Sequence, residues 1–224
     1  HLTIQMETVD NQAEALYVLG DLFEYWAGDD DLDDPFNAKI CAGLQRLSQS
    51  GVPLFFMAGN RDFLAGDGFA SKAGLTLLPD PALVEIAGAS VLLMHGDTLC
   101  TDDDAYQMFR TEVRSPEWRK SFLALPLDQR KAKIEALRQE SEAQKRAKPA
   151  EIMDVNPAAV LQVLTSHRCT RLIHGHTHRP ALHRLAVAGE ACERWVLPDW
   201  YESGGYLACD ASGCRLLEWP PAAV

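Results

Sequence analysis

The sequence predicts one α/β domain that carries a helical insertion. Four short apolar segments each end close to a glycine. In every case Asp, Asn or His stands directly beside that glycine. Helical spacing recurs between the segments, and residues 104–150 have helical spacing without any strand pattern. Buried strands that end in polar residues are typical of α/β proteins, which place functional groups at the carboxyl ends of strands.

We expect the four apolar segments to be buried strands, at residues 15–19, 52–57, 90–94 and 170–173. Between them, the spacing of Ile40, Leu44 and Leu47 predicts a helix that stops near Gly51. We further expect a short helix at 69–74 and one or two strands within 76–87. Antiparallel strands are expected at 194–197, 205–209 and 215–219, with a hairpin turn at 210–213.

Residues 104–150 differ from the rest of the chain in charge. From Arg110 to Lys148 there are eleven basic and six acidic residues, whereas the whole chain has a net charge of -11. The middle of the segment, 118–127, is rich in Leu and aromatic residues. Two interpretations stay open. One is a solvated helical hairpin packed on the main domain, and the other is a lid with a basic face for phosphate or anionic lipid and an apolar face for acyl chains or the bilayer surface.

Composition excludes some classes of function. The acidic balance argues against nucleic acid as the main partner. The six cysteines are irregularly spaced and form no CxxC pair, which favours free thiols over a disulfide framework. We see no signal peptide and no apolar run of the roughly 20 residues that span a bilayer, so we expect a cytoplasmic protein.

The candidate site lies at the four predicted strand ends. Three of the seven histidines, His174, His176 and His178, fall within five residues, which favours a role in binding a metal ion or phosphate. The alternative is that they are surface residues of a polar loop. The other strand ends carry Asp21, Asn60 and His95, each beside a glycine that lets the backbone turn sharply. We interpret the acidic run at 29–34 as a solvated loop.

Asp, Asn and His without Cys suit Mn²⁺, Fe²⁺, Mg²⁺ or a catalytic Zn²⁺ better than a structural zinc. One aspartate can bridge two such ions, and the pair then activates a water for attack on a phosphoryl group. The chain has no GxSxG motif that would indicate a covalent nucleophile.

The motifs Gly20-Asp21, Gly59-Asn60-Arg61-Asp62, His95-Gly96 and Gly175-His176-Thr177-His178 resemble those of calcineurin-like metallophosphoesterases. Within that group, residues 17–24, 59–64, 93–102 and 173–180 are similar to the UDP-2,3-diacylglucosamine pyrophosphatases of lipid A biosynthesis, and the resemblance covers nearly the whole chain.

The resemblance implies a four-layer α/β/β/α sandwich of two mixed sheets, with a core at 1–103 and 151–224 and a lid at 104–150. It implies a monomer, peripheral to the cytoplasmic side of the inner membrane. The implied reaction is hydrolysis of UDP-2,3-diacylglucosamine at the α-phosphate, with two Mn²⁺, to give 2,3-diacylglucosamine 1-phosphate (lipid X) and UMP. Mg²⁺, Fe²⁺ and Zn²⁺ stay open as alternatives.

The resemblance also implies roles for individual residues. The implied metal ligands are His1, Asp21, Asn60, His95, His176 and His178, with Asp21 bridging. The implied catalytic residues are Asp21, Asn60, Arg61 and His176. The implied substrate contacts are Asn60, Arg61, Asp103, Tyr106, Ser141, Lys145, Lys148 and His176.

The sequence departs from the pattern at two places. Arg61 stands where most of the superfamily has a histidine; an arginine cannot deliver a proton at neutral pH but can neutralise phosphate charge. The family's first motif is Asp-x-His-Leu, and the chain begins at His1-Leu2 without that aspartate. We expect natural residues to be missing from this stretch. The alternatives are a lipid-binding pseudoenzyme and a hydrolase of another, soluble nucleotide diphosphate.

Overall fold

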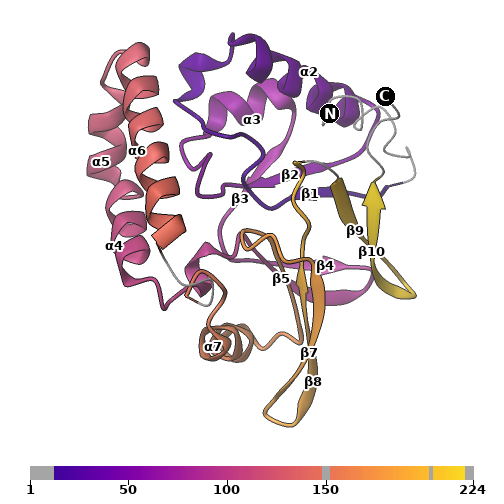
Figure 1. Ribbon diagram of the computed structural model, residues 1–224. Coiled ribbons are helices and arrows are strands. Elements are labelled where there is room, and N and C mark those ends of the chain that lie inside the picture. The colour runs from indigo at the N-terminus through magenta and orange to yellow at the C-terminus, as the bar shows by residue number, and fades with distance from the viewer. Residues whose placement is uncertain (1–12, 148–151, 202–203, 220–224) are drawn as a thin grey trace. The chain divides into compact units, whose positions relative to one another are not determined.

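The computed structural model describes residues 13–147, 152–201 and 204–219. The chain splits into two compact units (Figure 1): the first unit is His1–Leu78 with Asp102–Met153, and the second unit is Pro79–Thr101 with Asp154–Val224. Both units combine helices with strands, so the predicted α/β class is confirmed.

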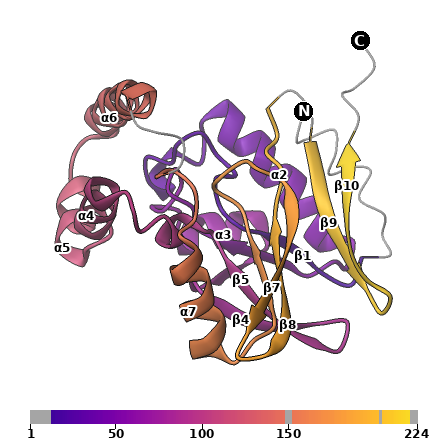
Figure 2. The ribbon, with the colours of Figure 1, turned by 60° about the horizontal axis from the view of Figure 1, so that its bottom comes forward.

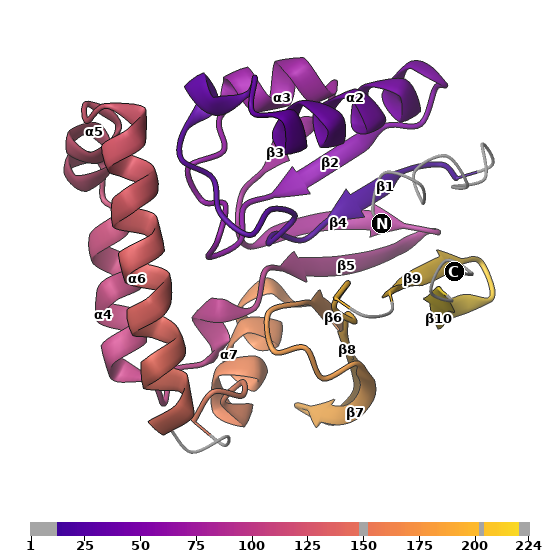
Figure 3. The same ribbon diagram turned by 45° about the horizontal axis from the view of Figure 1, so that its top comes forward.

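The first unit contains a parallel sheet in the order β1-β2-β3. Its strands are β1 (Leu16–Val18), β2 (Leu54–Met57) and β3 (Thr76–Leu78). Helices α2 (Pro35–Gln49) and α3 (Asp67–Ala73) lie over one face of this sheet, as Figure 3 shows. The two helices are the connections that parallel strands require, since such strands cannot be joined by a tight turn.

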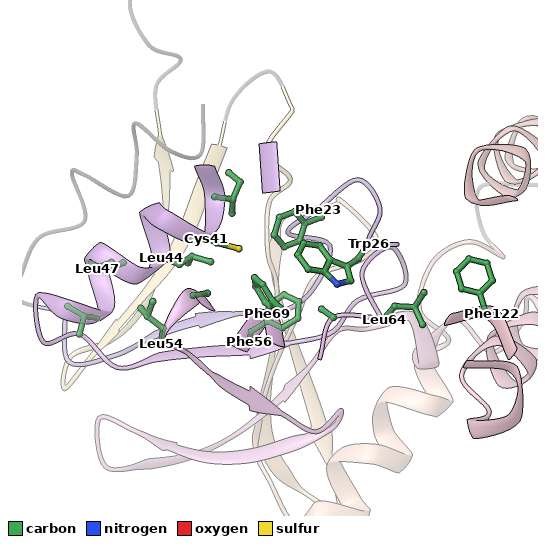
Figure 4. Packing of buried hydrophobic residues seen from close by; sticks show 14 residues of the cluster. Phe23, Trp26, Cys41, Leu44, Leu47, Leu54, Phe56, Leu64, Phe69 and Phe122 are labelled. Carbon is green, nitrogen blue, oxygen red and sulfur yellow. The ribbon is translucent and has the colours of Figure 1, made fainter. Parts of the chain in front are cut away.

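Aromatic side chains dominate the core of the first unit (Figure 4). Phe69 of α3 makes edge-on contacts with Phe23 and Phe56, at ring-centroid distances of 5.5 and 5.2 Å. Phe122, which comes from the predicted insertion, belongs to the same buried cluster. Each such ring contributes about 1.5 to 3 kcal/mol when it is fully buried.

The acidic run is an ordered anchor rather than the solvated loop that we expected. Its first residues form a 3₁₀ turn, η1 (Asp29–Asp31). The Asp29 carboxylate accepts hydrogen bonds from the backbone amides of Gly68 and Phe69 at 2.8 and 3.1 Å, near the start of α3. Asp31 is buried and pairs with Lys131 over 2.8 Å. The expectation was wrong because these partners lie far along the sequence.

The predicted helical insertion forms α4 (Asp104–Val113), α5 (Pro116–Leu123) and α6 (Leu127–Ala147). Helix α6 runs alongside α4 and α5, as both Figure 1 and Figure 3 show. Their apolar residues divide between two environments. Phe122 is buried, whereas Met108 and Leu123 are 75% and 40% exposed. The helices are therefore packed on the first unit and still present apolar side chains to solvent.

The second unit contains a mixed sheet in the order β4-β5-β6-β8-β7. Its strands are β4 (Ala82–Ile86), β5 (Ala89–Met94), β6 (Arg171–His174), β7 (Ala181–Val187) and β8 (Glu190–Val196). Strands β5, β6 and β8 run parallel, and the outer strands are antiparallel to their neighbours. Helix α7 (Pro157–His167) lies beside this sheet (Figure 2) and buries Val160 and Leu164 against Leu92 and Leu172.

Sequence patterns did not predict β7 or α7. Strand β7 lies at the sheet edge, and its apolar residues are interrupted by His183 and the exposed Arg184, so it has no continuous apolar run. The β7–β8 turn uses Ala188 and Gly189, both at positive φ. An Ala-Gly pair is a weak turn signal because the favoured first residues of such turns are Asn, Asp and Gly.

The last two strands, β9 (Gly204–Asp210) and β10 (Gly213–Trp219), form the predicted antiparallel hairpin. Cys209 and Cys214 face each other across it and form a disulfide, with Cα atoms 4.1 Å apart. The expectation of free thiols was therefore wrong for this pair, because pairing followed strand register rather than spacing along the sequence. The same expectation is confirmed for the other four cysteines, which are buried thiols.

Among the described residues, every helix is too short or too polar to cross a lipid bilayer.

Candidate active site

Asp21 lies three residues after the end of β1 and has a left-handed backbone, with φ of 54°. The buried Asp62, after β2, holds this turn in place. Its carboxylate accepts hydrogen bonds from the backbone amides of Asp21 at 3.2 Å, Leu22 at 2.7 Å and Gly59 at 2.7 Å. One buried carboxylate thus ties together the turns that follow two neighbouring parallel strands.

Arg61 joins the same two turns through its backbone and its side chain. Its amide donates a 2.9 Å hydrogen bond to Oδ1 of Asp21. Its guanidinium lies 3.8 Å from Oδ2 of Asp21 and forms an ion pair with Glu24. The first unit therefore brings together two predicted residues, Asp21 and Arg61, so that a carboxylate and a guanidinium lie side by side.

In the second unit, His95 follows β5 and His176 follows β6. Their rings pack edge to face with centroids 5.1 Å apart, so the two predicted metal ligands are neighbours. The turn after β5 requires Gly96, which has φ of 115°. A Cβ there would lie 2.8 Å from Nδ1 of His174.

His178 lies two residues after His176, and both have left-handed backbones, with φ of 55° and 65°. Left-handed backbone costs a residue other than glycine about 1 to 2 kcal/mol, and such strain clusters at functional sites. Nδ1 of His178 is 3.4 Å from a carboxylate oxygen of Asp199, and its ring lies against Tyr201 with centroids 5.6 Å apart.

His174 is the third histidine of the cluster, and it is a buried residue of β6. Its Nε2 accepts a hydrogen bond from Nη1 of Arg194 at 3.1 Å, so Nδ1 carries the proton and donates to the carbonyl of Gly175 at 2.9 Å. Burial, with the neighbouring Arg194 and His95, lowers the pKa of His174 to about 4. It is thus a neutral imidazole that supports the turn before His176.

Four of the predicted substrate contacts, Asp103, Tyr106, Ser141 and Lys145, lie on or beside the helices of the insertion. Asp103 caps α4, since its side chain accepts a 3.1 Å hydrogen bond from the backbone amide of Tyr106 in the first turn. Ser141 lies exposed on α6, and Lys145 belongs to the same helix. The side chain of Lys145 lies outside the described part of the structure, as do the whole of His1 and Lys148.

Sequence reasoning missed three residues that shape these turns: Asp62, Glu24 and Asp199. Asp62 stands within the Gly59-Asn60-Arg61-Asp62 motif, and that position was a signal, although its role as an acceptor for distant amides is tertiary. Glu24 stands at the end of the 17–24 motif, but its pairing with Arg61 is tertiary. Asp199 stands outside the motifs, and no local pattern distinguishes it from a surface carboxylate.

Residues 4–180 match the family model described as calcineurin-like phosphoesterase. Three relatives share the name UDP-2,3-diacylglucosamine hydrolase. The protein of Aromatoleum aromaticum is 52% identical over 94% of this chain and 83% of its own length. That of Enterobacter sp. (strain 638) is 48% identical over 93% and 86%, and that of Aeromonas hydrophila is 50% identical over 91% and 84%.

The family model spans every one of the four predicted strand ends, and the relatives are similar over almost the whole chain. The chain therefore belongs to the calcineurin-like phosphoesterase family.

Proposed function

We propose that this protein is a metal-dependent hydrolase that cleaves the diphosphate of UDP-2,3-diacylglucosamine. The observation that carries the proposal is the 52% identity, over 94% of the chain, to a relative with that hydrolase name. The hydrogen bond between Asp21 and Arg61 and the ring contact between His95 and His176 support it, because each joins residues with charged or metal-binding side chains that follow neighbouring strands.

We assign the metal ligands to Asp21, Asn60, His95, His176 and His178, together with His1. Carboxylate and amide oxygens with imidazole nitrogens fit a divalent ion such as Mn²⁺, and the chemistry of this donor set excludes a thiolate-type structural zinc site. Bound there, the ions would supply Lewis acidity to the phosphoryl oxygens and lower the pKa of the attacking water.

The chain's own residues would hold the diphosphate. We assign this to Arg61 and Asn60, with His176, because a guanidinium offers several N–H donors to phosphate oxygens. Arg61 cannot release a proton at neutral pH, and the reaction does not require it to do so. The leaving group at the α-phosphorus is a sugar phosphate, which departs as an anion, so attack there gives UMP and 2,3-diacylglucosamine 1-phosphate.

We assign the acyl-sugar end of the substrate to the insertion, residues 104–150, acting as a lid. Exposed Met108, Phe109, Leu123 and Leu137 on its three helices provide apolar surface for acyl chains or for a membrane surface. The assigned glucosamine-phosphate contacts are Asp103, Tyr106, Ser141, Lys145 and Lys148. We place the protein as a monomer on the cytoplasmic side of the inner membrane, where such a lipid substrate would be met.

The test is mass spectrometry of the products formed from UDP-2,3-diacylglucosamine in ¹⁸O-labelled water with Mn²⁺. The expected result is one ¹⁸O atom in UMP and none in the sugar phosphate, since the oxygen enters at the α-phosphorus. Label in the sugar phosphate would contradict attack at that atom. Turnover of soluble nucleotide diphosphates alone would favour a different hydrolase, and absence of both turnover and bound metal would favour a lipid-binding pseudoenzyme.

A further inference from the structure

Glu24 lies three residues after Asp21, in the turn that follows β1, and it contacts two arginines. One is Arg61, whose Nη1 donates to Oε2 of Glu24. The other is Arg138 of α6, whose Nη2 donates to the same oxygen at 3.0 Å. Glu24 is therefore the common partner of the phosphate-binding arginine and of a residue on the long helix of the insertion.

Helix α6 is fixed to the first unit along one face. Arg130 is 2% exposed and donates to the carbonyl of Ala27 at 2.5 Å, in addition to its ion pair with Asp30. Ile134, one turn later, packs against the buried core cluster. Arg138 follows after one more turn, because residues four apart on a helix lie on the same face. The contact with Glu24 thus continues a row of attachments.

We propose that Glu24 is a positioning residue, which holds the Arg61 guanidinium beside Asp21 and links its orientation to α6. The inference rests on the proposed function, because it assumes that Arg61 meets the scissile diphosphate. Glu24 itself does not touch the reacting atoms and acts through Arg61.

Physical chemistry favours positioning over stabilisation as its role. Glu24 and Arg138 are 49% and 40% exposed, and exposed ion pairs contribute little to stability. An arginine side chain, however, loses much rotamer freedom when it is fixed. A carboxylate that restricts Arg61 before substrate binds reduces the rotamer freedom that is lost during the reaction. Small errors in the position of such a group lower the rate by large factors.

The test compares Glu24→Gln, Arg138→Ala and Arg61→Ala, alone and combined, in the full-length protein. Two substrates are used with Mn²⁺: UDP-2,3-diacylglucosamine and bis(p-nitrophenyl) phosphate, which lacks nucleotide, sugar and acyl chains. We expect Glu24→Gln to lower kcat by about 5- to 20-fold on both substrates, a larger factor than any rise in KM, as for loss of orientation. Arg138→Ala should lower kcat by about threefold, and by no further factor when Glu24 is already Gln.

The matched control is Glu193→Gln, since Glu193 also pairs with an arginine, Arg171, over 3.0 Å, and should leave kcat unchanged. The decisive comparison is between Arg61→Ala and the double variant Arg61→Ala/Glu24→Gln, in which Glu24→Gln should have no further effect on kcat. An undiminished effect there, or retention of more than half of kcat by Glu24→Gln alone, overturns the proposal.

Failure of the proposed function is distinguishable. If only bis(p-nitrophenyl) phosphate is hydrolysed, the assigned substrate is wrong. The role of Glu24 is then decided by the kcat values of the variants on that diester. If neither is hydrolysed, calorimetric binding of inorganic pyrophosphate decides. Both Arg61→Ala and Glu24→Gln should weaken binding by at least about threefold, as expected for a disturbed charge-assisted contact. An unchanged affinity in either variant overturns the inference.

Discussion

The carboxylate of Asp62 accepts a 2.7 Å hydrogen bond from the backbone amide of Leu22, a residue 40 positions earlier in the chain. Because the same carboxylate also binds the amide of Gly59, the turns after β1 and β2 share one acceptor. The geometry of Asp21 and Arg61 therefore depends on a residue that need not touch substrate.

Replacing Asp62 by Asn should destabilise the fold by about 2 to 4 kcal/mol, because an amide group would turn a donor toward backbone N–H groups and remove the charge. Urea denaturation measures this free energy of unfolding. The control is Asp67→Asn in the exposed first turn of α3, with an expected change below about 1 kcal/mol. Equal effects of the two substitutions would show that the buried Asp62 carboxylate contributes no more to the free energy of unfolding than an exposed one.

Replacing Asp21 by Ala should abolish hydrolysis and lower the bound metal content, because the proposed bridging carboxylate is lost. Metal per chain is measured by elemental analysis after gel filtration, and activity after chelation and addition of Mn²⁺. The control is Asp33→Ala, at an exposed position of the acidic run, and this variant should keep the metal content and the activity of the wild type. Survival of most activity in Asp21→Ala would contradict a two-metal site.

Replacing Arg61 by Ala should lower turnover by roughly 10²- to 10³-fold, which is the scale for losing one donor to developing charge. Arg61→Lys should recover only part of the loss, since an ammonium lacks the fork of donors. Steady-state kinetics on the two substrates named above checks both. A loss below about threefold in Arg61→Ala would mean that the guanidinium is not at the phosphate.

Thiol titration should find four reactive cysteines in the denatured protein before reduction and six after it, because Cys209 and Cys214 are joined. In the folded protein, burial raises the pKa of the Cys41 thiol to about 11, so alkylation near pH 8 should be slow. Mass spectrometry of the alkylated peptides checks both statements. Six reactive thiols before reduction would contradict the hairpin disulfide.

The Asp30–Arg130 pair should make stability depend on acid pH. The hydrogen bond from Arg130 lowers the pKa of Asp30 below its usual 3.8. A carboxyl with a depressed folded pKa contributes stability above its unfolded pKa and loses it as pH falls through the folded value. Asp30 is largely exposed, so Asp30→Asn should cost less than about 1 kcal/mol at pH 7, and this difference should begin to shrink near pH 3.8 and fall further as the pH drops below that value.

The check is the difference in unfolding free energy between the wild type and Asp30→Asn, measured from pH 7 to pH 3. A difference for Asp30→Asn that stayed constant across this range would assign the effect to something other than ionisation.

Much of the secondary structure could be predicted because it follows from local patterns. The apolar segments at 52–57 and 90–94 became β2 and β5, and the spacing of Ile40, Leu44 and Leu47 became the buried face of α2. Edge strand β7 could not be predicted, because an edge strand with one exposed face shows no apolar run.

The sequence alone determined the chemical inventory: Asp, Asn, Arg and His beside glycines at strand ends, and hence membership of a phosphoesterase family. These features are local, since a glycine beside a polar residue after an apolar run can be read from a few neighbours. Only the tertiary structure decided that Asp62 holds the Asp21 turn, that Glu24 joins Arg61 to Arg138, and that Cys209 pairs with Cys214. The first two contacts depend on the packing of segments that are distant in the sequence, and the third depends on the register of β9 and β10, which the spacing of the cysteines did not predict.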